Sequence, residues 1–138
     1  MTADRRRRIL RAVRVLVVDD DDSTRGVLVE ALADEGYVVM PAADGAAALA
    51  LLEAWRPDLI LLDLLMPGMD GWAFTEAYQQ IAPPHAPLVL LTAGTVGLEE
   101  TVAGRPVPAA AGVLPKPFIL DDLLALVQRH AQSAPHPA

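Results

Sequence analysis

The 138-residue chain contains no cysteine and only one lysine, and aromatic residues make up 4% of it. Without cysteine there is no disulfide framework, no thiolate zinc site and no thiol nucleophile. No run of about 18 uncharged apolar residues occurs, and the apolar stretch after the N-terminal arginines is too short for a signal peptide. We therefore expect neither a membrane span nor secretion, and we predict a cytoplasmic protein.

Hydrophobic residues are abundant at 53%, which is too many for an intrinsically disordered chain. The length suits one domain of about 100 to 150 residues and leaves no space for a separate output domain. We predict a single folded domain over residues 13–131, preceded by a basic tail at 1–12 and followed by a tail at 132–138.

The formal charge of −7 is unevenly distributed. Residues 1–14 hold six arginines, whereas residues 15–138 hold 5 basic and 17 acidic residues. An acidic body repels phosphate backbones, so we expect no direct DNA binding. The run Arg5 to Arg8 has the chemistry to bind nucleic acid or acidic lipid, but a solvated tail is the interpretation we favour for so short a run.

Short apolar runs alternate with segments of helical period along the chain. Strands that are buried on both faces and separated by helices belong to a parallel sheet covered on each side. The sequence therefore predicts an α/β fold with a doubly wound, five-stranded parallel sheet of the flavodoxin-like type. The expected strands are Val15–Val18, Tyr37–Met40, Leu59–Leu62, Leu88–Leu91 and Gly112–Leu114.

Capping residues and prolines delimit the expected helices. Ser23 is a candidate cap for the first helix and Gly36 a candidate for its left-handed end. Asp44 caps a second helix that continues through Trp55. Two further helices are predicted at Trp72–Ile81 and from Asp121 onward, with only a short, irregular fourth one at about Leu98–Ala103, where glycine and proline are frequent.

Polar residues follow four of the predicted strands. Asp19 and Asp20 follow the first, Asp63 the third, Thr92 the fourth and Lys116 the fifth. Because the carboxyl ends of parallel strands meet at one edge, we expect these side chains to converge. Three carboxylates repel one another unless a cation lies among them, and their hard oxygen atoms suit magnesium. Such a site can support transfer of a phosphoryl group to a carboxylate.

The chain resembles the receiver domain of two-component response regulators from about Val13 to Ala131. Each matching stretch is short, but their order and spacing together are highly specific. The stretches are Val15–Asp21, Asp58–Asp63, Met66–Gly71, Leu90–Ala93 and Leu114–Phe118.

The resemblance implies a phosphorylated residue and a metal site. Asp63 would be the phosphoacceptor, and Mg²⁺ would be its cofactor. By the same resemblance, Asp20 binds the metal directly and Asp19 mainly through water. Asp63 and the main-chain carbonyl of Leu65 complete the set of metal ligands that the protein supplies. Thr92 would hydrogen-bond the phosphoryl group.

Lys116 would pair first with Asp63 and then with the phosphate, and the Lys116–Pro117 peptide bond is expected to be cis. Receivers commonly carry Tyr or Phe where this chain has Val113, so we expect the backbone of residues 94–111, rather than a ring, to respond to phosphorylation.

The resemblance also implies partners. We expect phosphoryl transfer from a sensor histidine kinase or a histidine phosphotransfer protein, and a downstream protein target. The chain would be a signalling switch rather than an enzyme, catalysing only its own phosphorylation and dephosphorylation. We expect a stand-alone receiver, a monomer or weak dimer, unless these 138 residues are part of a longer protein.

Two alternatives remain open at this point. The run Asp20 to Thr24 also matches the Asp-x-Asp-x-Thr signature of haloacid-dehalogenase-like phosphatases, with Asp20 as nucleophile. That family needs a later acidic pair and usually a cap domain, whereas Asp121 and Asp122 lie at a helix start. The other alternative is a phosphate-independent interaction module with a receiver fold.

Overall fold

The computed structural model describes residues 12–93, 101–102 and 104–132. Within these ranges five strands form one sheet in the order β2-β1-β3-β4-β7, and every neighbouring pair is parallel. The predicted doubly wound, five-stranded parallel sheet is therefore confirmed. Its strands are β1 (Arg14–Val18), β2 (Val38–Ala42), β3 (Leu59–Asp63), β4 (Leu88–Ala93) and β7 (Gly112–Lys116).

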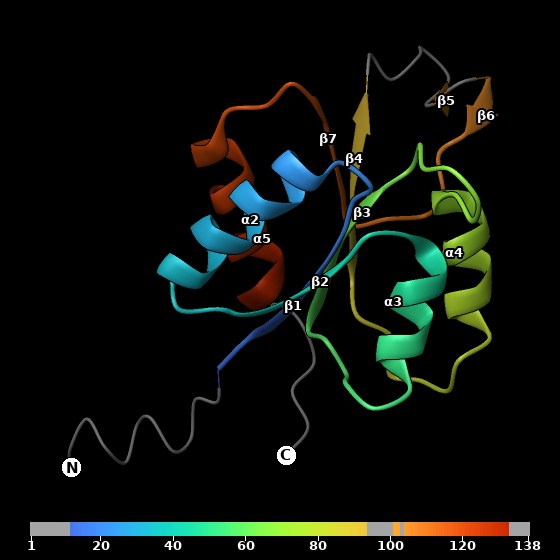
Figure 1. The fold of residues 1–138 in the computed structure, drawn as a ribbon, viewed down its shortest axis with the longest axis horizontal. Helices are drawn as coiled ribbons and strands as arrows, with labels where there is room; N and C mark the ends of the chain where they lie inside the picture. Colours follow the sequence, from blue (N-terminus) through green and yellow to red (C-terminus); the bar gives the residue numbers. More distant parts are fainter. Residues whose placement is uncertain (1–11, 94–100, 103, 133–138) are drawn as a thin grey trace.

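Helices cover both faces of the sheet (Figure 1). Helices α2 (Asp22–Asp34) and α5 (Leu120–Gln132) lie on one face, and α3 (Gly45–Leu52) and α4 (Gly71–Gln79) lie on the other. Alternate residues of β1 point to opposite faces of the sheet: Val15 and Val17 pack with α2 and α5, while Leu16 and Val18 pack with α3 and α4. This two-sided burial explains why the central strands β1, β3 and β4 are apolar along most of their length.

The described helices largely follow their predicted caps, with one correction. The cap of α2 is Asp21, not Ser23, and its carboxylate accepts a 2.8 Å hydrogen bond from the amide of Thr24. Asp21 stands three residues before Thr24, which is the spacing that a capping side chain needs, whereas Ser23 is already inside the first turn. Gly36 follows the helix with a φ of 94°, as predicted, and Asp44 caps α3.

Helix α3 ends at Leu52, about one turn before the predicted end at Trp55. The amides of Glu53 and Ala54 bond to carbonyls three residues back, so the chain tightens and leaves the helix there. Trp55 still packs against the core of this face. None of the described helices is long and apolar enough to cross a bilayer.

A short antiparallel hairpin replaces part of the predicted fourth helix. Strands β5 (Thr101–Val102) and β6 (Arg105–Pro106) pair with each other next to the start of α4 (Figure 1). The prediction of a helix at Leu98–Ala103 is wrong for Thr101 and Val102, and its remaining residues lie outside the described ranges. Thr and Val favour extended backbone, Gly104 takes a φ of 75°, and Pro106 has no amide to continue a helix.

The two predicted tails fall almost entirely outside the described residues. Only residue 12 of the first tail and residue 132 of the second are described, and the run Arg5 to Arg8 is not. Their roles therefore stay predictions.

Candidate functional site

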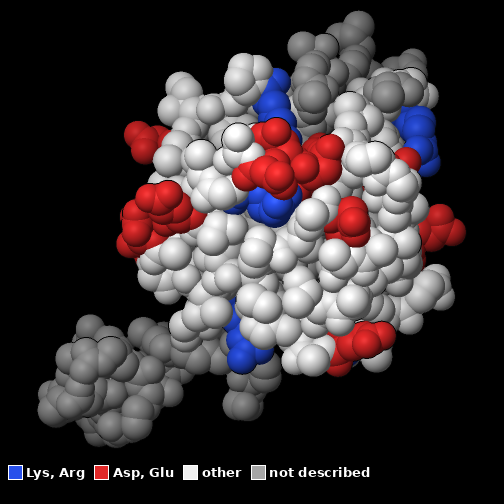
Figure 2. Space-filling view, viewed as in Figure 1, with Lys and Arg blue, Asp and Glu red and all other residues white. Residues whose placement is uncertain are grey.

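The expected strand-end residues do converge at one edge of the sheet. Asp63 is the last residue of β3 and Lys116 the last of β7, while Asp19 directly follows β1. Thr92, near the end of β4, is fully buried at the same edge. Figure 2 shows acidic side chains gathered on the viewed face with basic side-chain atoms directly beside them. Parallel strand order alone brings these distant residues together.

Asp19 is fully buried and both of its carboxylate oxygens are engaged. Oδ1 accepts a 2.9 Å hydrogen bond from the amide of Asp21, and Oδ2 accepts one of 2.7 Å from Nζ of Lys116. A buried polar side chain is costly unless its hydrogen-bonding atoms are paired, and these two contacts meet that requirement for Asp19.

Asp63 is also buried, with 4% of its surface exposed. Its Oδ1 accepts a 3.1 Å hydrogen bond from the amide of Leu65, and its Oδ2 lies 3.6 Å from Nζ of Lys116. Burial raises the pKa of Asp63 to about 7; the Lys116 ammonium opposes this shift and the Asp19 carboxylate adds to it. Asp63 is thus a carboxylate whose charge depends on nearby cations.

Lys116 contacts two carboxylates at once. Its expected ion pair with Asp63 is present, but its shorter contact is with Asp19, which the sequence did not predict. Burial alone would lower the pKa of Lys116, but the hydrogen bond with Asp19 and the charge of Asp63 outweigh it, so the net shift is upward. The ammonium therefore stays protonated at neutral pH.

Asp19, Asp20 and Asp63 form the one group of three acidic side chains in the described ranges arranged to share a cation. Each offers a carboxylate oxygen, and these atoms all lie within 4.8 Å of one another. Asp20 is exposed, whereas the other two are buried. Oxygen atoms of this kind are what Mg²⁺ prefers, so the donor set fits the expected ion.

The comparison with known families decides the class of the protein. The family model of the response regulator receiver domain matches residues 15–128. The chain belongs to this family. The receiver family consists of signalling modules of two-component systems rather than true enzymes.

Relatives of known name support this assignment. The response regulator MprA of Mycobacterium ulcerans is 40% identical over 114 residues, which are 83% of this chain and 48% of MprA. The DNA-binding transcriptional regulator NtrC of Escherichia coli is 41% identical over 115 residues, which are 83% of this chain and 24% of NtrC. The receiver chain thus spans about half the length of MprA and about a quarter of that of NtrC.

Solved structures show the same architecture. The chemotaxis response regulator CheY4 of Vibrio cholerae matches with a TM-score of 0.72 at 36% identity, over 86% of this chain and 98% of that one. The signal receiver domain of a putative Luxo repressor protein from Vibrio parahaemolyticus matches with a TM-score of 0.76 at 29% identity, over 89% of this chain and 92% of that one.

Two features near the acidic group depend on backbone geometry. The Lys116–Pro117 bond is cis, as predicted. Gly71, at the start of α4, donates a 2.9 Å hydrogen bond to the carbonyl of Leu64. A Cβ at Gly71 would lie 2.6 Å from the Cα of Leu64, so only glycine allows the loop after Asp63 to fold back this closely.

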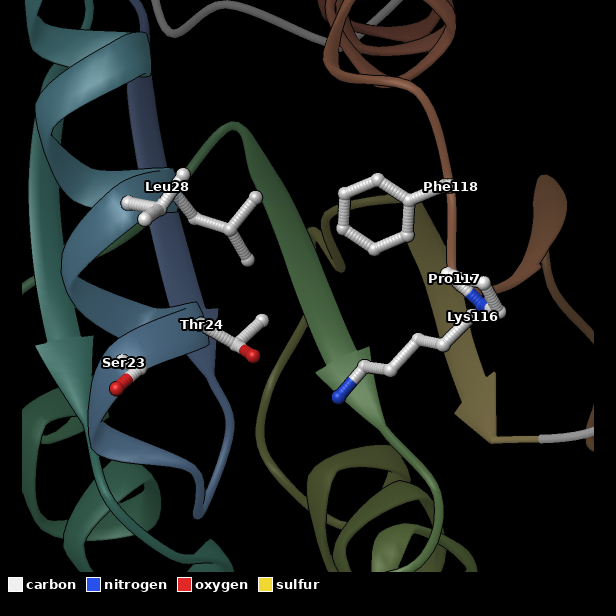
Figure 3. Close-up of a pocket in the computed structure, with 7 residues that line it drawn as sticks. Ser23, Thr24, Leu28, Lys116, Pro117 and Phe118 are labelled. Atoms are coloured by element: carbon white, nitrogen blue, oxygen red, sulfur yellow. The ribbon is translucent and has the colours of Figure 1, made fainter.

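A hollow of about 570 Å³ borders the receiver site between α2 and the segment that follows β7. Figure 3 shows the Phe118 ring directed toward Leu28 of α2, with Lys116 extending toward the strand ends. Ser23 and Thr24 line the same side of the hollow as Leu28. The acidic site is therefore bordered on this side by an apolar depression.

Sequence reasoning missed Arg25. Its guanidinium donates a 2.7 Å hydrogen bond to the main-chain carbonyl of Asp19 and also pairs with Asp22. Residues 15–138 contain only five basic side chains, and Arg25 follows the aspartate run within one helical turn. That scarcity of basic residues is the signal that could have pointed to Arg25.

Proposed function

We propose that Asp63 accepts a phosphoryl group from a phosphohistidine and so acts as the switch of a two-component phosphorelay. The observation that carries this proposal is the position of Asp63, buried at a strand end and 3.6 Å from the only lysine of the chain. The acidic group formed with Asp19 and Asp20 lies directly beside it.

In the proposed step, an oxygen of ionised Asp63 attacks the phosphorus of the phosphohistidine. A phosphorus–oxygen bond forms while the phosphorus–nitrogen bond breaks, and the electron pair of that bond leaves with the imidazole, which takes up a proton. Lys116 then contacts the phosphoryl oxygens, and the hydroxyl of Thr92 hydrogen-bonds another of them.

Asp20 and Asp63 would hold Mg²⁺ directly with the main-chain carbonyl of Leu65, and Asp19 would hold it through water. When bound, Mg²⁺ supplies positive charge that offsets the charge on the transferring phosphoryl oxygens. Burial raises the pKa of Asp63 to about 7, so a cation beside it favours the ionised form that attacks.

The proposed partners follow from this chemistry. The phosphoryl donor is a sensor histidine kinase or a histidine phosphotransfer protein, and the phosphorylated receiver docks on a downstream protein target in the cytoplasm. The described surface carries a large excess of acidic over basic residues, which disfavours direct contact with DNA. The receiver catalyses only its own phosphorylation and dephosphorylation.

Labelling with acetyl phosphate tests the assignment. Wild type incubated with acetyl phosphate and Mg²⁺ should gain the mass of one phosphoryl group, and Asp63→Asn should gain none. EDTA should abolish labelling of the wild type. Equal labelling of wild type and Asp63→Asn would refute the role of Asp63.

The same experiment addresses both alternatives. A haloacid-dehalogenase-like phosphatase would label on Asp20, so its labelling would survive Asp63→Asn and disappear in Asp20→Asn. A phosphate-independent module would not be labelled at all. The match of residues 15–128 to the receiver family favours the receiver over the phosphatase.

A further inference from the structure

Arg25 lies in the first turn of α2, beside the acidic group, and reaches back to the end of β1. Its Nη1 donates a 2.7 Å hydrogen bond to the main-chain carbonyl of Asp19, and Nη2 pairs with the carboxylate of Asp22. The side chain of Arg25 is 19% exposed, whereas that of Asp22 is 89% exposed. The contact with the carbonyl of Asp19 is therefore less exposed to solvent than the contact with Asp22.

The carbonyl that Arg25 contacts belongs to the peptide joining Asp19 and Asp20. Strand β1 ends at Val18 and α2 begins at Asp22, so this peptide lies in the short connection between the two. Its orientation sets the directions in which the two neighbouring carboxylates leave the backbone. A hydrogen bond to its carbonyl limits the rotation of that peptide.

We propose that Arg25 is a positioning residue for the cation site, and that its hydrogen bond holds the Asp19–Asp20 peptide so that both carboxylates face Asp63. This role rests on the proposed function, because it concerns the magnesium ion that phosphorylation would need. Groups that orient metal ligands without touching the metal affect affinity strongly, typically by about tenfold to a hundredfold.

The charge of Arg25 has the opposite effect. A guanidinium beside three carboxylates repels a divalent cation, so loss of the charge alone would strengthen magnesium binding. Loss of the positioning hydrogen bond would weaken it. The sign of the change in affinity therefore separates the two roles.

Isothermal titration of Mg²⁺ into the wild type, Arg25→Ala and Arg25→Lys measures that sign. We expect Arg25→Ala to bind Mg²⁺ about tenfold more weakly than the wild type. Arg25→Lys keeps the charge but lacks the planar, multi-donor guanidinium, and we expect an intermediate affinity. Labelling of Asp63 in Arg25→Ala should recover at saturating Mg²⁺, which a general structural defect would not allow.

Arg56 provides a matched control. Its Nη1 donates a 3.0 Å hydrogen bond to the carbonyl of Ala82, in an exposed position before β3 begins, away from the carboxyl ends of the strands. Arg56→Ala removes an arginine–carbonyl contact of the same type, so it should leave magnesium affinity unchanged.

Magnesium binding by Arg25→Ala that equals or exceeds that of the wild type would overturn the positioning role. If Arg25→Ala does not fold, Arg25→Lys decides in its place, because an affinity equal to that of the wild type would show that the guanidinium contact is not needed and would overturn the role. A wild type that binds no Mg²⁺ would overturn the proposed function together with this role. Failure of the positioning role alone would instead leave magnesium binding by the wild type intact.

Discussion

Asp19 and Asp20 are neighbours in the sequence, but their surroundings differ completely. Asp19 is fully buried and paired with Lys116, whereas Asp20 is exposed. The buried carboxylate is paired with the Lys116 ammonium, whereas the exposed one offers an oxygen within 4.8 Å of oxygens from Asp19 and Asp63. The two residues should therefore contribute differently to metal binding and to folding.

We expect Asp20→Asn to weaken Mg²⁺ binding more than Asp19→Asn does, by about tenfold or more, because a direct ligand loses both charge and a bond. Isothermal titration calorimetry with Mg²⁺ measures the two affinities, and the melting temperature of each variant in EDTA checks that it is folded. The reverse order of affinities would contradict the ligand roles proposed for these two residues.

Asp63 gives the metal-free protein a pH-dependent stability. Because burial raises its pKa from 3.8 to about 7, the folded state holds a proton that the unfolded state has released between those pH values. The contribution to stability is present below about pH 4 and is lost as pH rises through 7. In EDTA, the stability of Asp63→Asn relative to the wild type should therefore increase from pH 5 to pH 8.

Urea denaturation of both proteins at the two pH values checks this expectation. Asparagine does not titrate, and Lys116 keeps its contact with Asp19 in the variant, so the difference between the proteins isolates the carboxyl group of Asp63. A difference that is the same at pH 5 and pH 8 would show that the pKa of Asp63 is not raised.

At the scale of elements, the β5–β6 hairpin is held against α4 by Arg105 and by a hydrogen bond from Trp72. The guanidinium of Arg105 lies 4.2 Å from the centroid of the Trp72 ring and pairs with Asp70 at 3.1 Å. Nε1 of Trp72 donates a 2.7 Å hydrogen bond to the carbonyl of Pro106. Because Asp70 also caps α4, the hairpin and the loop that follows Asp63 share this contact.

Arg105→Ala should lower the free energy of unfolding by about 1 kcal/mol, since exposed cation–π contacts and ion pairs each contribute less than or about that amount. Amide exchange across residues 101–106 should become faster. Arg56→Ala is again the matched control and should leave exchange in the hairpin unchanged. Unaltered exchange in Arg105→Ala would show that this arginine does not hold the hairpin.

At the scale of the whole molecule, the hairpin replaces part of the short fourth helix that the sequence predicted. Val113 occupies the position where the resemblance to receivers implies an aromatic ring. Val113 is only partly buried against the core of the α3 and α4 face. Its small, stiff side chain cannot report a movement of Thr92 by swinging inward. Activation should therefore act through the backbone of the segment between β4 and β7.

We expect Mg²⁺ with beryllofluoride, a phosphoryl mimic, to change hydrogen exchange in residues 101–111 without forming a strong dimer. Sedimentation of the same samples measures the oligomeric state, and Asp63→Asn is the control that should not respond. Tight dimers on activation, or exchange changes confined to the loops around Asp63 and Lys116, would contradict this expectation.

The sequence by itself determined the sheet and most of the site. Apolar runs such as Leu59–Leu62 predicted buried parallel strands, and the carboxyl ends of parallel strands meet at one edge, so the convergence of Asp63 and Lys116 followed from the pattern. Local signals were also sufficient for caps such as Asp44, because a cap bonds to an amide three residues away.

Only the tertiary structure decided which partners these groups take. The contact of Lys116 with Asp19 joins residues 97 positions apart, and it depends on strand order and side-chain direction rather than on local pattern. The hairpin at Thr101 is held against α4 by the hydrogen bond from Trp72 to Pro106, which joins residues 34 positions apart and has no local signal in the sequence. The raised pKa of Asp63 likewise arises from burial, which exists only once the layers have packed.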